Sequence, residues 1–141
     1  MEDYEKLQEK NEKRNKKYLN AFENYLKNQG LTTKTINKHL SNVDFYLNDY
    51  LNYYDIIKME DGVSEINMYL GDWFIRKCLW SSKTSIKENA ASIKKFYKCM
   101  SELNYIPKEN YDFLCSIIKN NMEIWLDNLE EYDNDIYDDL F

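Results

Sequence analysis

Apolar residues recur at helical spacing through most of this 141-residue chain, and turn signals divide them into five stretches. The clearest stretch follows Gly30, a residue type that commonly ends a helix. Thr32 or Thr33 can then cap a new helix by accepting backbone N–H bonds. The apolar residues that follow step by three and four along one face: Ile36, Leu40, Val43, Leu47, Tyr50, Leu51 and Tyr54. We predict a helix over this stretch.

The other four stretches have the same periodicity and predict four more helices. The helix before Gly30 uses Tyr18, Phe22, Tyr25 and Leu26. After an Asp61-Gly62 turn, the next helix uses Ile66, Tyr69, Leu70, Trp73 and Phe74. A fourth helix, capped by Ser82 or Ser85, uses Ile86, Ala90, Ile93, Phe96, Tyr97, Met100 and Leu103. Pro107 ends that section, and the fifth helix uses Tyr111, Leu114, Ile118, Met122, Trp125, Leu126 and Leu129.

Both ends of the chain depart from this pattern. Residues 8–17 contain no apolar residue, so we expect a solvated lead-in that can be helical but cannot pack by itself. After Tyr132 acidic residues dominate, and we expect a frayed or loosely docked end. The sequence therefore predicts four parts: a polar lead-in at 1–17, a helical domain at 18–107, an additional helix at 108–132 and an acidic tail at 133–141.

Composition agrees with one compact all-α domain. Three glycines and one proline leave few places to break a helix, and 43% apolar residues can form a core. No apolar run approaches the roughly 20 residues of a membrane span, and the first ten residues lack the apolar segment of a signal peptide. We therefore expect a cytoplasmic protein with no membrane partner. Its three cysteines include no C-x-x-C pair, which fits reduced, structural thiols.

The net charge of −6 is unevenly distributed. From Glu123 onward there are eight acidic residues and no Lys or Arg. The remaining 17 acidic and 19 basic residues give residues 1–122 a net charge of +2. The whole chain is therefore not attracted to nucleic acid by its net charge, but a basic face on the body could be.

Two segments of the sequence resemble the start of tyrosine recombinases and phage integrases. The first is Phe22…Tyr25-Leu26…Gly30-Leu31-Thr32…Thr35-Ile36…His39…Leu47. The second is Ser82-Lys83-Thr84…Ile86…Ala90…Ile93-Lys94-Lys95-Phe96-Tyr97…Leu103…Ile106-Pro107. The resemblance covers about residues 18–107. It implies a SAM-like core-binding domain, an orthogonal four- to five-helix bundle that clamps one side of the DNA while a separate domain performs the chemistry.

The catalytic half of that family has no counterpart in this sequence. After Pro107, where the catalytic domain should begin, the chain continues into one more helix and the acidic tail. That domain needs two arginines, histidines and a nucleophilic tyrosine, whereas this chain has only Arg14, Arg76 and His39. There is also no nucleophile–base pair or phosphate-binding glycine loop. We expect a protein that is not an enzyme and uses no cofactor.

A metal site is also not expected. His39 and the three cysteines could in principle form a Cys₃His zinc site, but these residues lack closely spaced ligand pairs. The cysteines at 99 and 115 adjoin predicted core positions and are better interpreted as small buried residues. An acidic pair such as Glu130-Glu131 could hold Mg²⁺, but nothing in the sequence orders it.

Lysines occur on the helices that meet the DNA backbone in the recombinase family. Together with neighbouring hydroxyls, they could neutralise and bind phosphates. The predicted DNA contacts are Lys34, Thr35, Lys38, Lys83, Thr84, Lys87, Lys94 and Lys95. The alternative is that these lysines form ordinary solvated helix faces, interspersed with acids such as Glu88. Our preferred prediction is weak binding to duplex DNA, as an accessory factor of a recombination or mobile-element system.

The acidic carboxy-terminal segment gives a second hypothesis. It could keep the protein soluble, fold over the lysine faces, or imitate a phosphate backbone and bind a basic nucleic-acid-binding protein, as a phage or mobile-element inhibitor would. The predicted interaction residues are Trp125, Glu130, Glu131, Tyr132, Asp133, Asp135, Asp138 and Asp139. The abundance of tyrosines also suits a homodimer, which the sequence leaves open.

Overall fold

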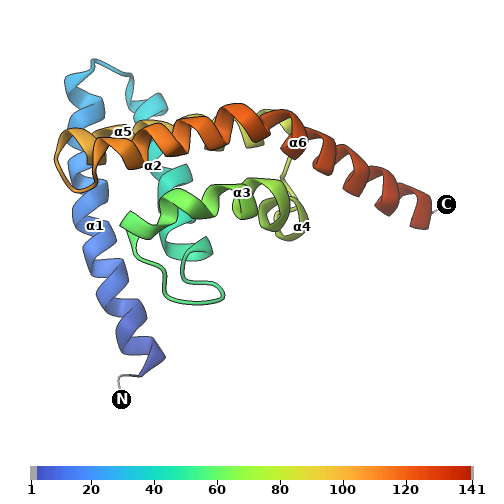
Figure 1. Ribbon diagram of the computed structural model, residues 1–141, viewed down its shortest axis with the longest axis horizontal. Coiled ribbons are helices and arrows are strands. Elements are labelled where there is room, and N and C mark those ends of the chain that lie inside the picture. The colour runs from blue at the N-terminus through green and yellow to red at the C-terminus, as the bar shows by residue number, and fades with distance from the viewer. Residues whose placement is uncertain (1–2, 141) are drawn as a thin grey trace.

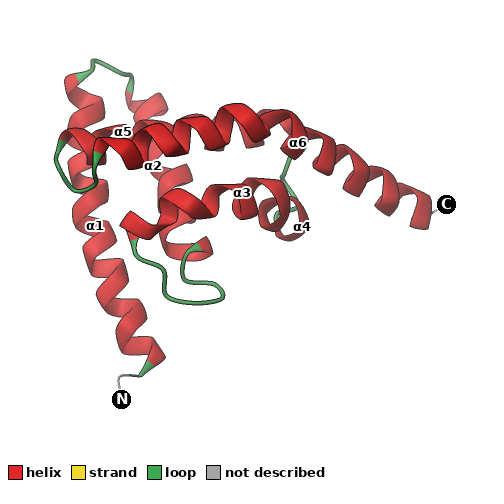
Figure 2. Cartoon of the chain, viewed as in Figure 1, coloured by secondary structure: helices red, strands yellow, loops and turns green. Residues whose placement is uncertain are grey.

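The computed structural model describes residues 3–140, and all regular structure within that range is helical (Figure 1, Figure 2). Its helices are α1 (Tyr4–Asn28), α2 (Thr33–Asp44), α3 (Ile66–Met68), α4 (Phe74–Lys77), α5 (Lys83–Glu102) and α6 (Lys108–Leu140). A π-helical segment, Tyr69–Trp73, joins α3 to α4, so that these form one continuous helix. The described residues therefore contain the five predicted helices.

The predicted apolar stripes form the core. Helix α5 packs against α6, α2 and α1, and six of its seven stripe residues are buried. The exceptions to the predicted pattern are Leu103 and Tyr54, which keep 48% and 66% of their surface exposed. Leu103 directly follows α5, and Tyr54 lies in a bend after the second predicted helix, which ends at Tyr50 and not at Tyr54 as predicted.

Two predicted helix caps and the predicted stop at Gly30 are confirmed. Thr32 Oγ1 accepts a hydrogen bond from the Thr35 backbone N–H at 3.3 Å. Ser82 Oγ accepts from the Ser85 N–H at 3.0 Å, and Ser85 Oγ accepts from the Ser82 N–H at 2.7 Å, so each serine satisfies a backbone donor of the other. Gly30 has a φ of +75°, the left-handed conformation that glycine adopts most easily.

Two π-helical segments, which the periodicity did not predict, pack against each other. Helix α2 continues as the π-helical segment Phe45–Tyr50, and its Tyr46 and Tyr50 rings lie 4.8 Å from the Tyr69 ring. Tyr69 belongs to the second π-helical segment. These rings fill the space between the two helices.

The first half of α1 differs from the expected solvated lead-in. Asn11 and Asn15, which lie in the stretch without apolar residues, are each only 1% exposed. Asn11 Nδ2 donates to Asn52 Oδ1 at 2.8 Å and to the Ile57 carbonyl at 3.1 Å. Asn15 Nδ2 donates to Asn48 Oδ1 at 2.8 Å. Amide hydrogen bonds, not apolar contacts, therefore hold this part of α1 against the body.

Helix α6 is longer than predicted and continues through the acidic segment to Leu140, where we expected a frayed or loosely docked end. Figure 1 shows its last turns extending beyond the body of the molecule. Upstream, Trp125 is fully buried and packs against Gly71, where an added Cβ would lie 2.7 Å from Trp125 Cδ1. None of the helices in residues 3–140 combines the length and the apolar character that crossing a membrane requires.

Candidate functional site

Four lysines form an exposed stripe along α5. Lys83, Lys87, Lys94 and Lys98 are separated by four, seven and four residues, which places them on one face of a helix. All four are exposed, and Ala91 occupies the exposed position at the middle of the stripe. At 1.5 Å per residue the stripe is about 22 Å long. We call these four residues the lysine stripe.

The lysine stripe and the predicted set of DNA contacts differ at two lysines. Lys98 was not among the predicted contacts, although its spacing of four from Lys94 could have identified it. Lys95 was among them, but it lies off the stripe, half-buried on the side of α5 that faces α2. The stripe and Lys95 are therefore two separate surfaces.

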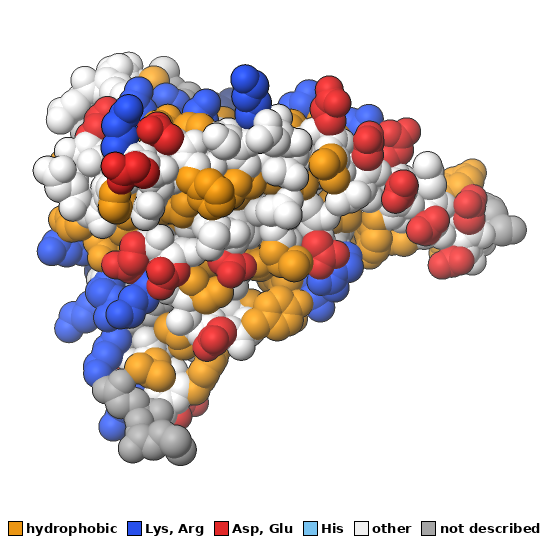
Figure 3. Space-filling model, viewed as in Figure 1, with side chains coloured by type: hydrophobic (Ala, Val, Ile, Leu, Met, Phe, Trp, Pro, Cys, Tyr) orange, Lys and Arg blue, Asp and Glu red, His pale blue; other side chains and the backbone are white. Residues whose placement is uncertain are grey.

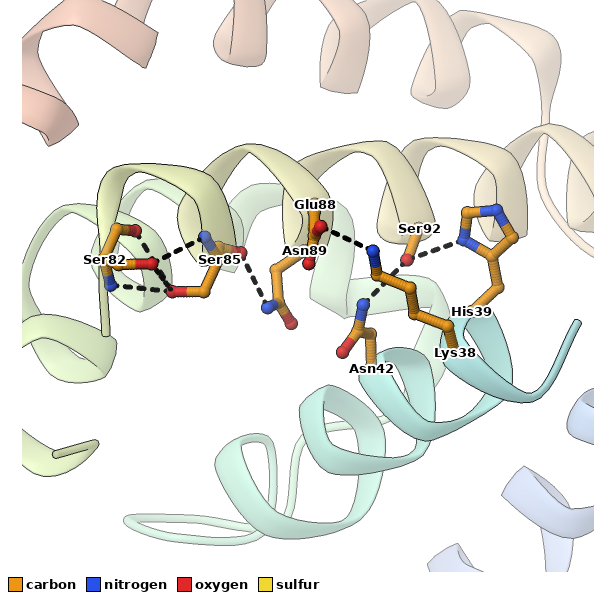
Figure 4. Close-up of polar contacts among 8 residues, drawn as sticks. All are labelled: Lys38, His39, Asn42, Ser82, Ser85, Glu88, Asn89 and Ser92. Carbon is orange, nitrogen blue, oxygen red and sulfur yellow. Dashed lines mark hydrogen bonds and ion pairs between the residues drawn. The ribbon is translucent and has the colours of Figure 1, made fainter. Parts of the chain in front are cut away.

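Polar side chains connect α2 and α5 beside the stripe (Figure 4). Lys38 Nζ lies 2.5 Å from Glu88 Oε1, and this ion pair neutralises one of the predicted DNA contacts. Asn42 Nδ2 donates to Ser92 Oγ at 3.0 Å, and Ser92 Oγ lies 2.7 Å from His39 Nδ1. Because Ser92 is fully buried, these bonds satisfy a hydroxyl that would otherwise be orphaned.

The environment of His39 favours its neutral form. Partial burial lowers its pKa below the ordinary value of 6.5, and the positive charges of Lys95 and Lys38 lower the pKa further. A neutral imidazole can accept a hydrogen bond from the Ser92 hydroxyl at Nδ1, and Asn42 donates to the Ser92 oxygen. The geometry thus gives the only histidine a role at the helix–helix contact.

Of the remaining predicted DNA contacts, Lys34 and Thr84 are exposed. Thr35 Oγ1 lies 3.0 Å from Thr32 Oγ1 and is part of the cap of α2. Lys83 lies 3.6 Å from Glu130 of α6, the one ion pair in residues 3–140 that joins the lysine stripe to the acidic segment. Lys34, Lys87 and Lys94 make no ion pair within the described part of the chain.

The prediction that Trp125 contacts a partner protein is wrong. Trp125 is fully buried, and its indole N–H donates to Asn67 Oδ1 at 2.7 Å, so a partner protein cannot reach it. Tyr132 is half-buried against the core. The acidic members are exposed: Glu130, Glu131, Asp133, Asp135, Asp138 and Asp139. We call residues 133–140 the acidic arm, which Figure 3 shows as a protrusion bearing clustered acidic side chains.

Within the part of the chain that the structure describes, no three or more His, Cys, Asp or Glu side chains gather where they could hold a metal ion. Cys78 and Cys99 are buried, and burial raises the pKa of both thiols to about 11, which keeps them protonated at neutral pH.

In comparisons of the chain with protein-family models, curated proteins and solved structures, nothing matches.

Proposed function

We propose that this chain binds the phosphate backbone of duplex DNA through the lysine stripe of α5, without catalysing a reaction. In this proposal the chain is a stand-alone module resembling the SAM-like, orthogonal core-binding bundle of tyrosine recombinases. It would serve as an accessory factor of a recombination or mobile-element system. The observation that carries the proposal is the stripe itself, four exposed lysines on one helix face.

The geometry of the stripe suits a phosphate backbone. Phosphates follow one another every 3.4 Å along the axis for each strand, so a stripe of about 22 Å extends over about six of them. Lys34, exposed at the start of the neighbouring α2, offers one more cation. Lysine contacts of this kind position a protein on DNA but read no sequence, so we expect binding without sequence preference.

The affinity should be low and strongly dependent on salt. Four phosphate contacts give a slope of about −3.6 in a plot of log K against log salt concentration. The acidic arm carries four Asp and no Lys or Arg, and its field opposes DNA binding. Replacing Asp133, Asp135, Asp138 and Asp139 with Asn should therefore strengthen binding at low salt.

The decisive experiment compares two triple variants with the same change in net charge. The first carries Lys87→Glu, Lys94→Glu and Lys98→Glu on the stripe. The control carries Lys6→Glu, Lys13→Glu and Lys58→Glu, all exposed residues outside α5. Binding to a labelled duplex is measured by fluorescence anisotropy at salt concentrations from about 20 mM up to the physiological value of about 150 mM. Binding should be lost only in the stripe variant. Equal losses in both variants, or no binding by the unmodified chain, would refute the proposal.

A second candidate function rests on the acidic arm. It is an exposed helix in which Ile136 and Leu140, at 43% and 73% exposure, lie among the aspartates. Such a surface suits a basic partner protein that brings apolar side chains, as an inhibitor of a nucleic-acid-binding protein would require. The test is binding to a lysine-rich amphipathic peptide. It should disappear when the four aspartates become Asn, and unchanged binding would exclude this function.

A further inference from the structure

A pocket of about 400 Å³ lies between residues 50–57, which follow α2, and the continuous helix that includes α3 and α4. Three aromatic side chains line it, Tyr50, Tyr54 and Trp73, together with three charged groups, the carboxylates of Glu65 and Asp72 and the guanidinium of Arg76. Its size is in the range of pockets that hold small molecules. We call this site the aromatic pocket, and it shares no residue with the lysine stripe or the acidic arm.

The aromatic pocket is built where the two π-helical segments end. Tyr50 is the last residue of one segment and Trp73 the last residue of the other. Both are only 4% exposed, and their rings meet edge to face at 5.1 Å. Single-turn π-helical segments are frequent at functional sites. Here they place two buried rings at the base of one pocket, whereas Tyr54 is 66% exposed at its edge.

The charges around the aromatic pocket leave one carboxylate uncompensated. Arg76 donates to both carboxylate oxygens of Asp72, at 2.9 Å from Nε and 2.8 Å from Nη2, which neutralises that acid. Glu65 receives a hydrogen bond from the Tyr50 hydroxyl at 3.3 Å. It makes no ion pair within residues 3–140. The aromatic pocket therefore carries a formal charge of −1.

The same group of rings already holds a cation of the chain. Lys77 Nζ lies 5.6 Å from the centroid of the Tyr53 ring. That ring contacts Tyr54 at 4.7 Å and Trp73 at 5.2 Å, so it belongs to the same aromatic cluster. An aromatic ring attracts cations to its face, most strongly when the cation is poorly hydrated. The cluster thus has the electrostatic character of a cation site.

We propose that the aromatic pocket binds a small organic cation, specifically an alkylated ammonium group. The aromatic rings attract the positive charge and contact the alkyl groups, and Glu65 supplies the opposite charge. The uncompensated charge of Glu65 disfavours anions, and a fully hydrated metal ion lacks the apolar surface that these rings contact. The proposal is independent of DNA binding, because no residue of the lysine stripe takes part.

The test uses choline and its uncharged analogue of the same shape, 3,3-dimethylbutan-1-ol, titrated into the full chain. Binding is followed by the NMR signal of the Trp73 indole N–H and by calorimetry. We expect choline to shift this signal in a saturable way and to bind at least about tenfold more tightly than the uncharged analogue. Equal binding of both compounds, or no saturable shift with choline, would overturn the proposal.

Two matched variants identify the residues responsible. Glu65→Gln removes the uncompensated charge and should weaken choline binding about tenfold, whereas Glu60→Gln, an exposed acid of the same 3₁₀-helix (Met59–Glu65), should not. Tyr54→Leu removes an exposed ring without opening the core and should also weaken binding. Equal effects of the Glu65 and Glu60 changes would contradict the proposed site. The triple stripe variant should bind choline normally, which separates this result from the DNA proposal.

Discussion

The two ends of the described chain show opposite relations between sequence pattern and packing. The first half of α1 contains a ten-residue stretch without an apolar side chain, yet it is attached to the body through Asn11 and Asn15. The acidic arm contains Ile136 and Leu140, yet every residue from 133 to 140 is exposed. A helix end is therefore packed only where another part of the molecule offers a surface that fits it, and local hydrophobicity alone does not decide this.

The physical reason lies in what each end meets. Opposite α1, the segment from Leu47 to Ile57 offers carbonyl and amide oxygens that asparagine side chains can reach. Burying an amide is costly unless it is hydrogen-bonded. Here the bonds to Asn48 and Asn52 satisfy the buried Nδ2 groups, whereas the amide oxygen of Asn15 has no hydrogen-bond partner within the described residues. The acidic arm extends beyond the body of the molecule (Figure 1), and Ile136 and Leu140 keep 43% and 73% of their surface exposed.

The largest expected effect tests the packed part of α6. Trp125→Ala should lower the free energy of unfolding by about 3–5 kcal/mol, because it leaves a large cavity and an unpaired Asn67. Urea denaturation measures this. The control is Ile124→Ala, a neighbouring residue that is 53% exposed and should change stability by less than about 0.5 kcal/mol. Similar losses for both would mean that α6 is not packed through Trp125.

An intermediate effect tests the asparagine contacts of α1. Asn11→Ala should lower the free energy of unfolding by about 1–3 kcal/mol, since Asn52 Oδ1 and the Ile57 carbonyl lose their donor. Asn24→Ala, at an exposed position of the same helix, should be neutral or slightly stabilising because alanine is the better helix former. If the Asn11 variant were as stable as the Asn24 variant, the first half of α1 would be solvated, as its sequence predicts.

These contrasts define what the sequence could predict. Helices α2 and α5 were predictable from the sequence, because in each the apolar stripe and the hydroxyl cap both indicate a helix over the same residues. The π-helical segments were not, since one inserted residue leaves the apolar spacing almost unchanged. The sequence alone also could not show whether Trp125 is buried in the core or contacts a partner protein. Its burial depends on packing against Gly71, which lies 54 residues away in the sequence.

The candidate surfaces were predictable to a similar degree. Helical spacing places Lys83, Lys87 and Lys94 on one face, and the structure confirms that all three are exposed. The Lys38–Glu88 ion pair could not be foreseen, since it requires knowing how α2 packs on α5. The aromatic pocket likewise depends on the contact between Tyr50 and Trp73, which only the fold creates.

A smaller effect depends on pH and concerns His39. Its pKa is lower in the folded state than the ordinary 6.5, so the unfolded chain binds the proton more readily. Stability should therefore be fully retained above about pH 6.5 and should decrease as the pH falls toward the folded pKa. His39→Asn should remove this component of the pH dependence. Because His39 is the only histidine, one imidazole signal reports its NMR titration, and a midpoint at or above 6.5 would contradict this.

The smallest expected effect concerns the acidic arm. Removing residues 133–141 should change the free energy of unfolding by less than about 0.5 kcal/mol, since every residue from 133 to 140 is exposed. Removing residues 123–141 should instead unfold the protein, because that cut also deletes Trp125 and Leu129. Only the shorter truncation can therefore test whether the arm opposes DNA binding. A marked loss of stability from that truncation would show that the arm is packed and would remove the contrast with α1.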